Sequence, residues 1–249
     1  MSVGVEKRQR SDQFTFKRFQ IDQTDCAMRI SSDATIFGAY IAVENAKTIL
    51  DIGTGTGLLA LMVAQRAHPE ARIDAVEISP VAFARAKENA AASPFADMIN
   101  PINQSIQEFA LQSHKRYELI LSNPPFYQND LPSSAKDSAN IARHSHENGL
   151  DFAAMLAAVE QLLHDDGIFW VLLPAAESAT FSALASAAGL HEKERLCLRH
   201  SSSDPINRMI SAYSRRVTVP EIHELVRHNE DSSPTPELRE LLSPYMLNY

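Results

Sequence analysis

The residues best suited to chemistry in this chain are Asn123, Pro124, Pro125 and Phe126, which follow directly after an apolar run. Each proline fixes the preceding residue in extended geometry and lacks an N–H, which leaves carbonyl oxygens to face a pocket. The Asn123 side-chain oxygen and the Pro124 carbonyl can then accept both hydrogens of a planar exocyclic amine. Phe126 can stack on the ring that bears this amine. The segment predicts a clamp that orients an amino group for group transfer.

A second segment, from Asp51 to Gly57, is typical of a nucleotide cofactor turn. Gly53, Gly55 and Gly57 permit a tight strand-to-helix turn and a close approach of the backbone to a ligand. The spacing differs from the Gly-x-Gly-x-x-Gly of dinucleotide-binding folds, and the Asp51 carboxylate would repel a pyrophosphate. That carboxylate suits the ammonium of a methionine moiety instead. Taken alone, the segment also fits an ordinary strand-to-helix turn.

An acid follows at the end of the next predicted strand. Glu77 stands 24 residues after Gly53, near the distance at which nucleotide-binding α/β folds place a carboxylate on ribose hydroxyls. We therefore expect Glu77 to bind the ribose of the cofactor.

These segments require a sheet whose strands end at one edge. Strand-like and helix-like runs alternate through the middle of the chain, which predicts an α/β fold with a doubly wound, mostly parallel sheet covered on both faces. The expected strands are 48–52, 72–78, 99–103, 117–121, 168–173, 196–199 and 206–216, the last two forming an antiparallel hairpin. The expected helices are 26–42, 58–67, 80–92, 150–163, 181–188 and 237–242.

The composition is that of an ordinary globular protein. The chain has 249 residues, 45% hydrophobic and 22% charged, which is enough to bury a sizeable core. Cys26 and Cys197 are far apart and in no metal-like spacing, which indicates reduced thiols. His144 and His146 lack further ligands at metal spacing. With no apparent secretory signal or membrane-length apolar run, we expect a cytoplasmic protein without a metal, a membrane or an obligate protein partner.

The net charge of −8 argues mildly against a nucleic-acid partner, but the distribution of charge matters more. A local basic cluster comprises Lys7, Arg8, Arg10, Lys17 and Arg18. Aromatic residues at 14, 16 and 19 need a surface to pack against, although a solvated terminus is the alternative. We expect an RNA-binding arm over residues 1–22 and a single domain over 23–249. Arg143, in a long polar loop after the clamp, is a further candidate for a phosphate contact.

Together, the glycine turn and the clamp resemble the signature segments of S-adenosylmethionine-dependent methyltransferases that act on amino groups. The resemblance implies S-adenosyl-L-methionine as the cofactor and a Rossmann-like sheet of seven strands. Most of the chain is similar to the bacterial tRNA1(Val) (adenine-N6)-methyltransferases, through residues 14–19, 26–28, 32–39, 50–62, 74–77, 122–127 and 142–144. That family methylates N6 of adenine 37, just 3′ of the anticodon in a valine tRNA. The resemblance therefore implies this reaction, with tRNA and not DNA as the partner.

The resemblance also implies roles for individual residues. It places Asp33 and Asn123 beside the cofactor, together with the glycine turn and Glu77. Related enzymes often carry an acid where this chain has Ser105, so we expect Ser105 or Gln104 to hold the adenine of the cofactor. Other acceptors stay open at this point, namely guanine N2 in rRNA and a protein glutamine. A non-catalytic RNA-binding protein with a vestigial pocket is the alternative from another class.

Overall fold

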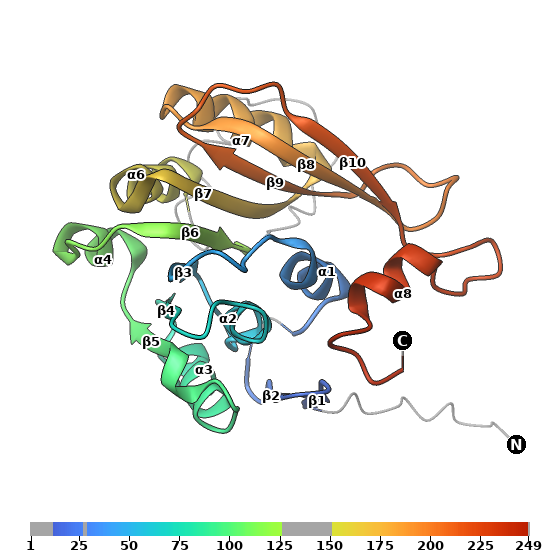
Figure 1. Ribbon diagram of the computed structural model, residues 1–249, viewed down its shortest axis with the longest axis horizontal. Helices are drawn as coiled ribbons and strands as arrows, with labels where there is room; N and C mark the ends of the chain where they lie inside the picture. Colours follow the sequence, from blue (N-terminus) through green and yellow to red (C-terminus); the bar gives the residue numbers. More distant parts are fainter. Residues whose placement is uncertain (1–11, 27–28, 126–150, 249) are drawn as a thin grey trace, which may run out of the picture.

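A computed structural model describes residues 12–26, 29–125 and 151–248, and its centre is one eight-stranded sheet (Figure 1). The strands are β3 (Thr48–Ile52), β4 (Arg72–Glu77), β5 (Ile99–Asn103), β6 (Tyr117–Ser122), β7 (Leu163–Pro174), β8 (His191–Arg199), β9 (Arg208–Ser214) and β10 (Glu221–Val226). Their order is β10-β8-β9-β7-β6-β3-β4-β5. In this sheet β9 runs antiparallel to both neighbours and the other pairs are parallel. The parallel strands therefore end at one edge, called the carboxyl edge below.

Two layers of helices cover the faces of the sheet. One face carries α1 (Ser32–Tyr40), α2 (Leu58–Ala64), α3 (Pro80–Ala91) and α8 (Pro236–Leu242), and the other carries α4 (Ile106–Gln112), α6 (Phe152–Leu162) and α7 (Ala175–Ala187). A 3-10 turn, η1 (Ala96–Met98), precedes β5. Neighbouring side chains on a strand point to opposite faces, so Ile49 joins the first core and Leu50 the second. Both layers bury apolar surface, which is the main stabilising contribution to this fold.

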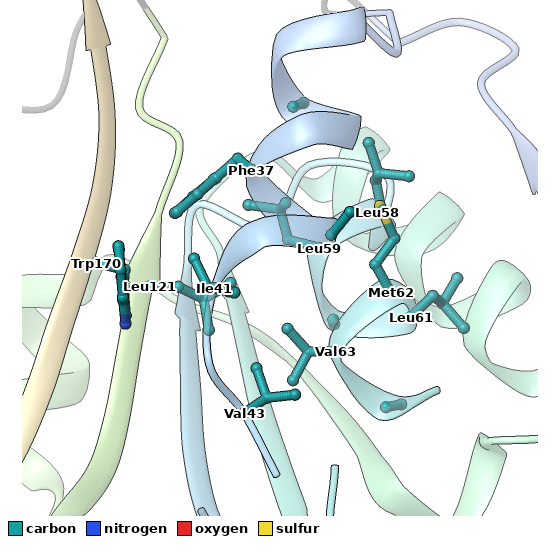
Figure 2. Close-up of a cluster of buried hydrophobic side chains, with 14 of the residues drawn as sticks. Phe37, Ile41, Val43, Leu58, Leu59, Leu61, Met62, Val63, Leu121 and Trp170 are labelled. Carbon is teal, nitrogen blue, oxygen red and sulfur yellow. The ribbon is translucent and has the colours of Figure 1, made fainter. Parts of the chain in front are cut away.

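The helix that leaves the glycine turn is held by close packing against α1. Figure 2 shows Phe37 and Ile41 near Leu59 of α2, and Met62 of the same helix belongs to the same buried core. Gly38 makes this approach possible, because a Cβ there would lie 2.7 Å from the Met62 sulfur. The first turn of α2 is thus fixed in place by a tightly packed core.

The N-terminal segment is packed on the domain from residue 12 onwards. β1 (Gln13–Thr15) and β2 (Gln20–Asp22) form an antiparallel hairpin. Phe16 and Phe19 are stacked with ring centroids 4.5 Å apart, and both are buried in the first core. The aromatic residues thus have the packing surface that their spacing requires. The division into an arm over 1–22 and a domain over 23–249 stays a prediction, and residues 1–11 lie outside the described part of the chain.

The predicted α/β fold is confirmed, with one strand more than the seven expected. The additional strand is β10, which pairs in parallel with β8. Its first four residues are exposed, so the sequence lacks the apolar alternation that reveals a strand. The short helix α4 was also not expected. The strands β3 and β5 have the predicted bounds. At the start, a helix expected over 26–42 begins only at Ser32.

Candidate active site

The glycine turn after β3 has the conformation that its three glycines permit. Gly53, Gly55 and Gly57 have φ values of 69°, 59° and 85°, in the left-handed region that other residues rarely adopt. The amides of Gly53 and Thr54 both donate to the Val76 carbonyl, at 2.9 and 3.0 Å. A Cβ built at Gly53 or Gly55 would meet nothing within 4 Å. The turn is therefore fixed against β4 and leaves open space on its other side.

Asp51, on β3 just before this turn, is fully buried. Its Oδ2 accepts a hydrogen bond from the Thr54 hydroxyl at 2.6 Å, while Oδ1 has no hydrogen-bond partner. Burial raises the pKa of this carboxyl to about 7, although the bond from Thr54 and the nearby Ala60 amide oppose the shift. An unpaired buried acceptor is costly unless a ligand satisfies it. Asp51 thus offers one oxygen to a donor or cation.

Glu77, at the end of β4, supports the turn from the neighbouring strand. Its Oε2 accepts from the Gly55 amide at 2.9 Å, and its Oε1 accepts from the Ser79 amide at 2.8 Å. A carboxylate has lone pairs for further bonds, so the role of Glu77 toward a ribose stays a prediction. These two contacts are a second function that the sequence did not indicate.

The Ser105 hydroxyl is used locally. Ser105 is the N-cap of α4, where it accepts from the Glu108 amide at 3.2 Å and donates to the Glu108 carboxylate at 2.8 Å. The Gln104 side chain donates to Gln112 at 3.0 Å. A contact from either residue to the adenine of a cofactor stays a prediction. The capping box is the reason α4 begins at this position.

The clamp begins beside the glycine turn. Ser122 pairs with Ile52 across β6 and β3, so Asn123 and Gly53 are the next residues on adjacent strands. The Asn123 Oδ1 atom is buried and has no hydrogen-bond partner, and Pro124 is buried beside it. Pro125 is exposed, and Phe126 lies outside the described residues. Two unsatisfied acceptors, on Asp51 and Asn123, therefore lie at the ends of neighbouring strands.

This site, with its two unsatisfied acceptors, fits S-adenosyl-L-methionine. The cofactor carries an ammonium, ribose hydroxyls and an electrophilic methyl group, which require acceptors and open space rather than phosphate-binding donors. Asp51, the open face of the glycine turn, Glu77 and Asn123 provide these features.

Asp33 lies at the same edge of the sheet, but its carboxylate has two partners in the protein. The Arg227 guanidinium donates to its Oδ1 at 2.6 Å, and Arg208 lies 3.3 Å from its Oδ2. The predicted contact of Asp33 with the cofactor therefore stays a prediction, and it would have to coexist with this ion pair. The sequence did not indicate this ion pair because Asp33 and Arg227 are 194 positions apart in the chain.

The described cations of the predicted arm lie at the opposite edge of the sheet. The Lys17 ammonium donates to the Ser243 carbonyl at 2.6 Å, and the Arg18 guanidinium lies 4.9 Å from the centre of the Phe95 ring. Phe95 is in the connection that leads into the start of β5. Their role toward RNA stays a prediction. The other predicted RNA contacts, Lys7, Arg8, Arg10 and Arg143, lie outside the described residues.

One residue that positions the turn was missed. Asn89 of α3 is buried, and its side-chain amide donates at 2.9 Å to the Thr56 carbonyl of the glycine turn and to the Asp22 carbonyl of the hairpin. Its oxygen accepts from the Asp22 amide at 2.9 Å. Asn89 thus ties the hairpin to the turn. A single Asn among the alanines of this helix was the available signal in the sequence.

Comparisons with known proteins agree with this geometry. The methyltransferase small domain model matches residues 26–176, more than half of the chain. Among solved structures, the fold is similar to a "predicted O-methyltransferase" from Agrobacterium tumefaciens, with a TM-score of 0.60, 18% identity and coverage of 87% of this chain and all of that one. It is also similar to a "putative RNA methyltransferase" from Pyrococcus horikoshii, with a TM-score of 0.53, 17% identity and coverage of 76% and 87%. At this identity the structures support the fold alone.

Curated relatives are considerably closer in sequence. A tRNA1(Val) (adenine(37)-N6)-methyltransferase from Dyadobacter fermentans is 40% identical over 246 residues, covering 96% of this chain and 99% of the relative. A protein of the same name from Yersinia enterocolitica is 37% identical over 238 residues, covering 95% and 93%. By this identity over nearly the full length, and by the turn and clamp described above, the chain belongs to the tRNA1(Val) (adenine(37)-N6)-methyltransferase family.

Proposed function

We propose that this protein transfers a methyl group from S-adenosyl-L-methionine to the exocyclic N6 of an adenine in tRNA, specifically adenine 37 of tRNA1(Val). The observation that carries the proposal is the buried Oδ1 of Asn123, which lacks a partner and lies beside the glycine turn. An acceptor in this position suits an amine and would be costly without one. The name shared by the curated relatives supports adenine 37 as the target.

The clamp acts by holding the amine in a reactive orientation. The Asn123 side-chain oxygen and the Pro124 carbonyl accept the two N–H bonds, which directs the nitrogen lone pair out of the plane of the base. The same two acceptors stabilise the positive charge that develops on the nitrogen during transfer. S-adenosyl-L-methionine, when bound, supplies an electrophilic methyl group. The proton lost from the nitrogen becomes acidic only after transfer, so this scheme needs no strong general base.

The residues of β3 and β4 hold the cofactor in this scheme. Asp51 accepts from the ammonium of the methionine moiety through Oδ1, the atom without a partner. Glu77 accepts from the ribose while it keeps its bonds to the Gly55 and Ser79 amides. The glycine turn lies between them, so the backbone contacts the cofactor closely.

Mass spectrometry of methylated nucleosides tests the proposal. The purified protein should convert A37 of a tRNA1(Val) transcript to N6-methyladenosine, and a transcript with G37 should stay unmodified. Bulk tRNA from a strain without the gene should lack the same modification. Methylation of guanine N2 in rRNA, or of a protein glutamine, in place of adenine would overturn the assignment of the acceptor. Cofactor binding without any transfer would point to the non-catalytic alternative.

A further inference from the structure

A group of arginines occupies the carboxyl edge of the sheet in its C-terminal half. Arg199 ends β8, Arg227 directly follows β10, and Arg208 begins β9, which runs in the opposite direction. Arg208 pairs with Pro174 at the end of β7, so all three residues lie at the edge that also carries Asn123. With adjacent strands about 4.8 Å apart, Arg208 lies roughly 10 Å from Asn123 across the sheet.

The three arginines are held together by specific bonds. The side chain of Arg227 is 9% exposed, and it donates both to Asp33 and, through Nε at 3.2 Å, to the Arg199 carbonyl. Arg208 shares the Asp33 carboxylate with Arg227. One carboxylate thus holds two guanidinium groups beside each other. A buried ion pair of this kind fixes the geometry of the cluster more than it stabilises the fold.

Two arginines of the cluster are partly exposed. The side chains of Arg199 and Arg208 are 27% and 26% exposed, and the neighbouring His200 is exposed. Arg199 pairs with Glu224, whose side chain is 47% exposed, and also donates to the Asp204 carbonyl at 2.8 Å. Among the residues that the structure describes, Asp204 and Glu177 are further acids near the cluster. An exposed ion pair contributes little, about 0–1 kcal/mol, so a phosphate can replace Glu224 at Arg199. Guanidinium groups bind phosphate in a planar, bidentate geometry.

We propose that Arg199 and Arg208 bind backbone phosphates of the substrate RNA, and that Arg227 positions them through Asp33 and the Arg199 carbonyl. This inference rests on the proposed function, because a base turned out into the clamp needs backbone contacts to offset the cost of unstacking. As an RNA-binding surface, the arginine cluster is better placed than Lys17 and Arg18, because it lies at the carboxyl edge with Asn123 and they lie at the opposite end of the strands. The two groups are also separated along the strand order, since Figure 1 shows β8, β9 and β10 at the top of the view and the hairpin of β1 and β2 at the bottom.

Binding of a tRNA1(Val) transcript at several KCl concentrations tests the surface, with the double variant Arg199→Gln/Arg208→Gln compared with Arg216→Gln. Arg216 is 74% exposed and paired with Asp166 beyond the other end of β9, which makes it a matched control. We expect about tenfold weaker binding by the double variant and a salt slope smaller by about 1–2, since each phosphate contact contributes nearly one unit. The control should bind as the wild type does.

Calorimetry with S-adenosylhomocysteine separates this surface from the cofactor site, because Arg199→Gln, which leaves both ion pairs of Asp33 in place, should keep its cofactor affinity within about twofold. If Arg208→Gln prevents folding, Arg199→Gln alone should still reduce the slope. If the wild type methylates tRNA but the folded variants show unchanged RNA affinity and an unchanged salt dependence, the inference is overturned and the proposed function is kept. A wild type that neither binds nor methylates tRNA would overturn the proposed function, and this inference with it.

Discussion

The two halves of the carboxyl edge differ in the groups that they present. Around β3, β4 and β6 the edge carries acceptors, the buried oxygens of Asp51 and Asn123 among them. Around β8, β9 and β10 it carries the guanidinium donors of Arg199, Arg208 and Arg227. Open α/β sheets bind ligands at this edge, and here one edge provides two chemically opposite surfaces.

The opposite character of the halves matches the two ligands of the proposed reaction. A cofactor with an ammonium and a target amine both need acceptors, whereas the RNA backbone needs donors. The overall charge of −8 therefore does not exclude RNA, because the relevant charges are local. The variants below separate the acceptor half from the donor half.

The largest effect is expected for Asn123→Ala, which removes an acceptor from the clamp. Turnover should fall by about a hundredfold or more, because the lost bond orients the amine and stabilises charge in the transition state. Binding of the cofactor should change little. Single-turnover assays and calorimetry on the same preparation measure the two quantities. A folded variant that has lost the cofactor would show that Asn123 mainly binds the cofactor.

Replacement of Gly55 by alanine tests the turn in the acceptor half. Its φ of 59° strains any residue with a Cβ by about 1–2 kcal/mol, so the turn should shift and cofactor affinity should fall about tenfold. Gly189→Ala is the matched control, since Gly189 has a φ of 75° after α7 and also has open space around it. Both variants should lose thermal stability, but only Gly55→Ala should lose affinity. If both variants bind the cofactor with the same affinity, the glycine turn is not part of the cofactor site.

The pH dependence of cofactor binding tests Asp51. Burial raises its pKa to about 7, and only the ionised form attracts an ammonium. Affinity should therefore rise roughly eightfold between pH 6 and pH 7.5, as the ionised fraction increases. Over the range from about pH 4 to 7 this group alone should make the unliganded protein less stable as pH rises, because the unfolded state ionises first. Asp51→Asn should flatten both profiles, and an identical pH profile in this variant would assign the dependence to another group.

The smallest effect is expected at the hairpin. The sequence predicts that removing residues 1–10, or reversing the charges of Lys17 and Arg18, weakens tRNA binding and reduces its salt slope. Since the Lys17 ammonium bonds the Ser243 carbonyl and Arg18 covers Phe95, we expect the charge reversal to weaken binding only about two- to threefold. Titrations beside Arg199→Gln/Arg208→Gln rank the two surfaces. A larger loss from the hairpin variant would reverse this ranking.

Local patterns made much of the acceptor half predictable. β3, the glycine turn and the clamp are each short segments whose residue types dictate a backbone geometry, through positive φ at glycine and extended geometry before proline. Strands such as β5 could also be predicted from the sequence, because residues typical of turns flank them. The exposed edge strand β10 and the short α4 were not, since neither has a strong apolar period.

The sequence by itself determined the fold class and the tight turn formed by the three glycines, because these depend on residues that are adjacent in the chain. Only the tertiary structure decided which groups Asp33, Asn89 and the arginines contact. Asp33 meets Arg227 across 194 positions, and Asn89 meets Asp22 across 67. Such contacts depend on strand order and register, which bring distant segments to one edge of the sheet. The same packing placed Lys17 and Arg18 at the other edge, where their charge alone could not locate them.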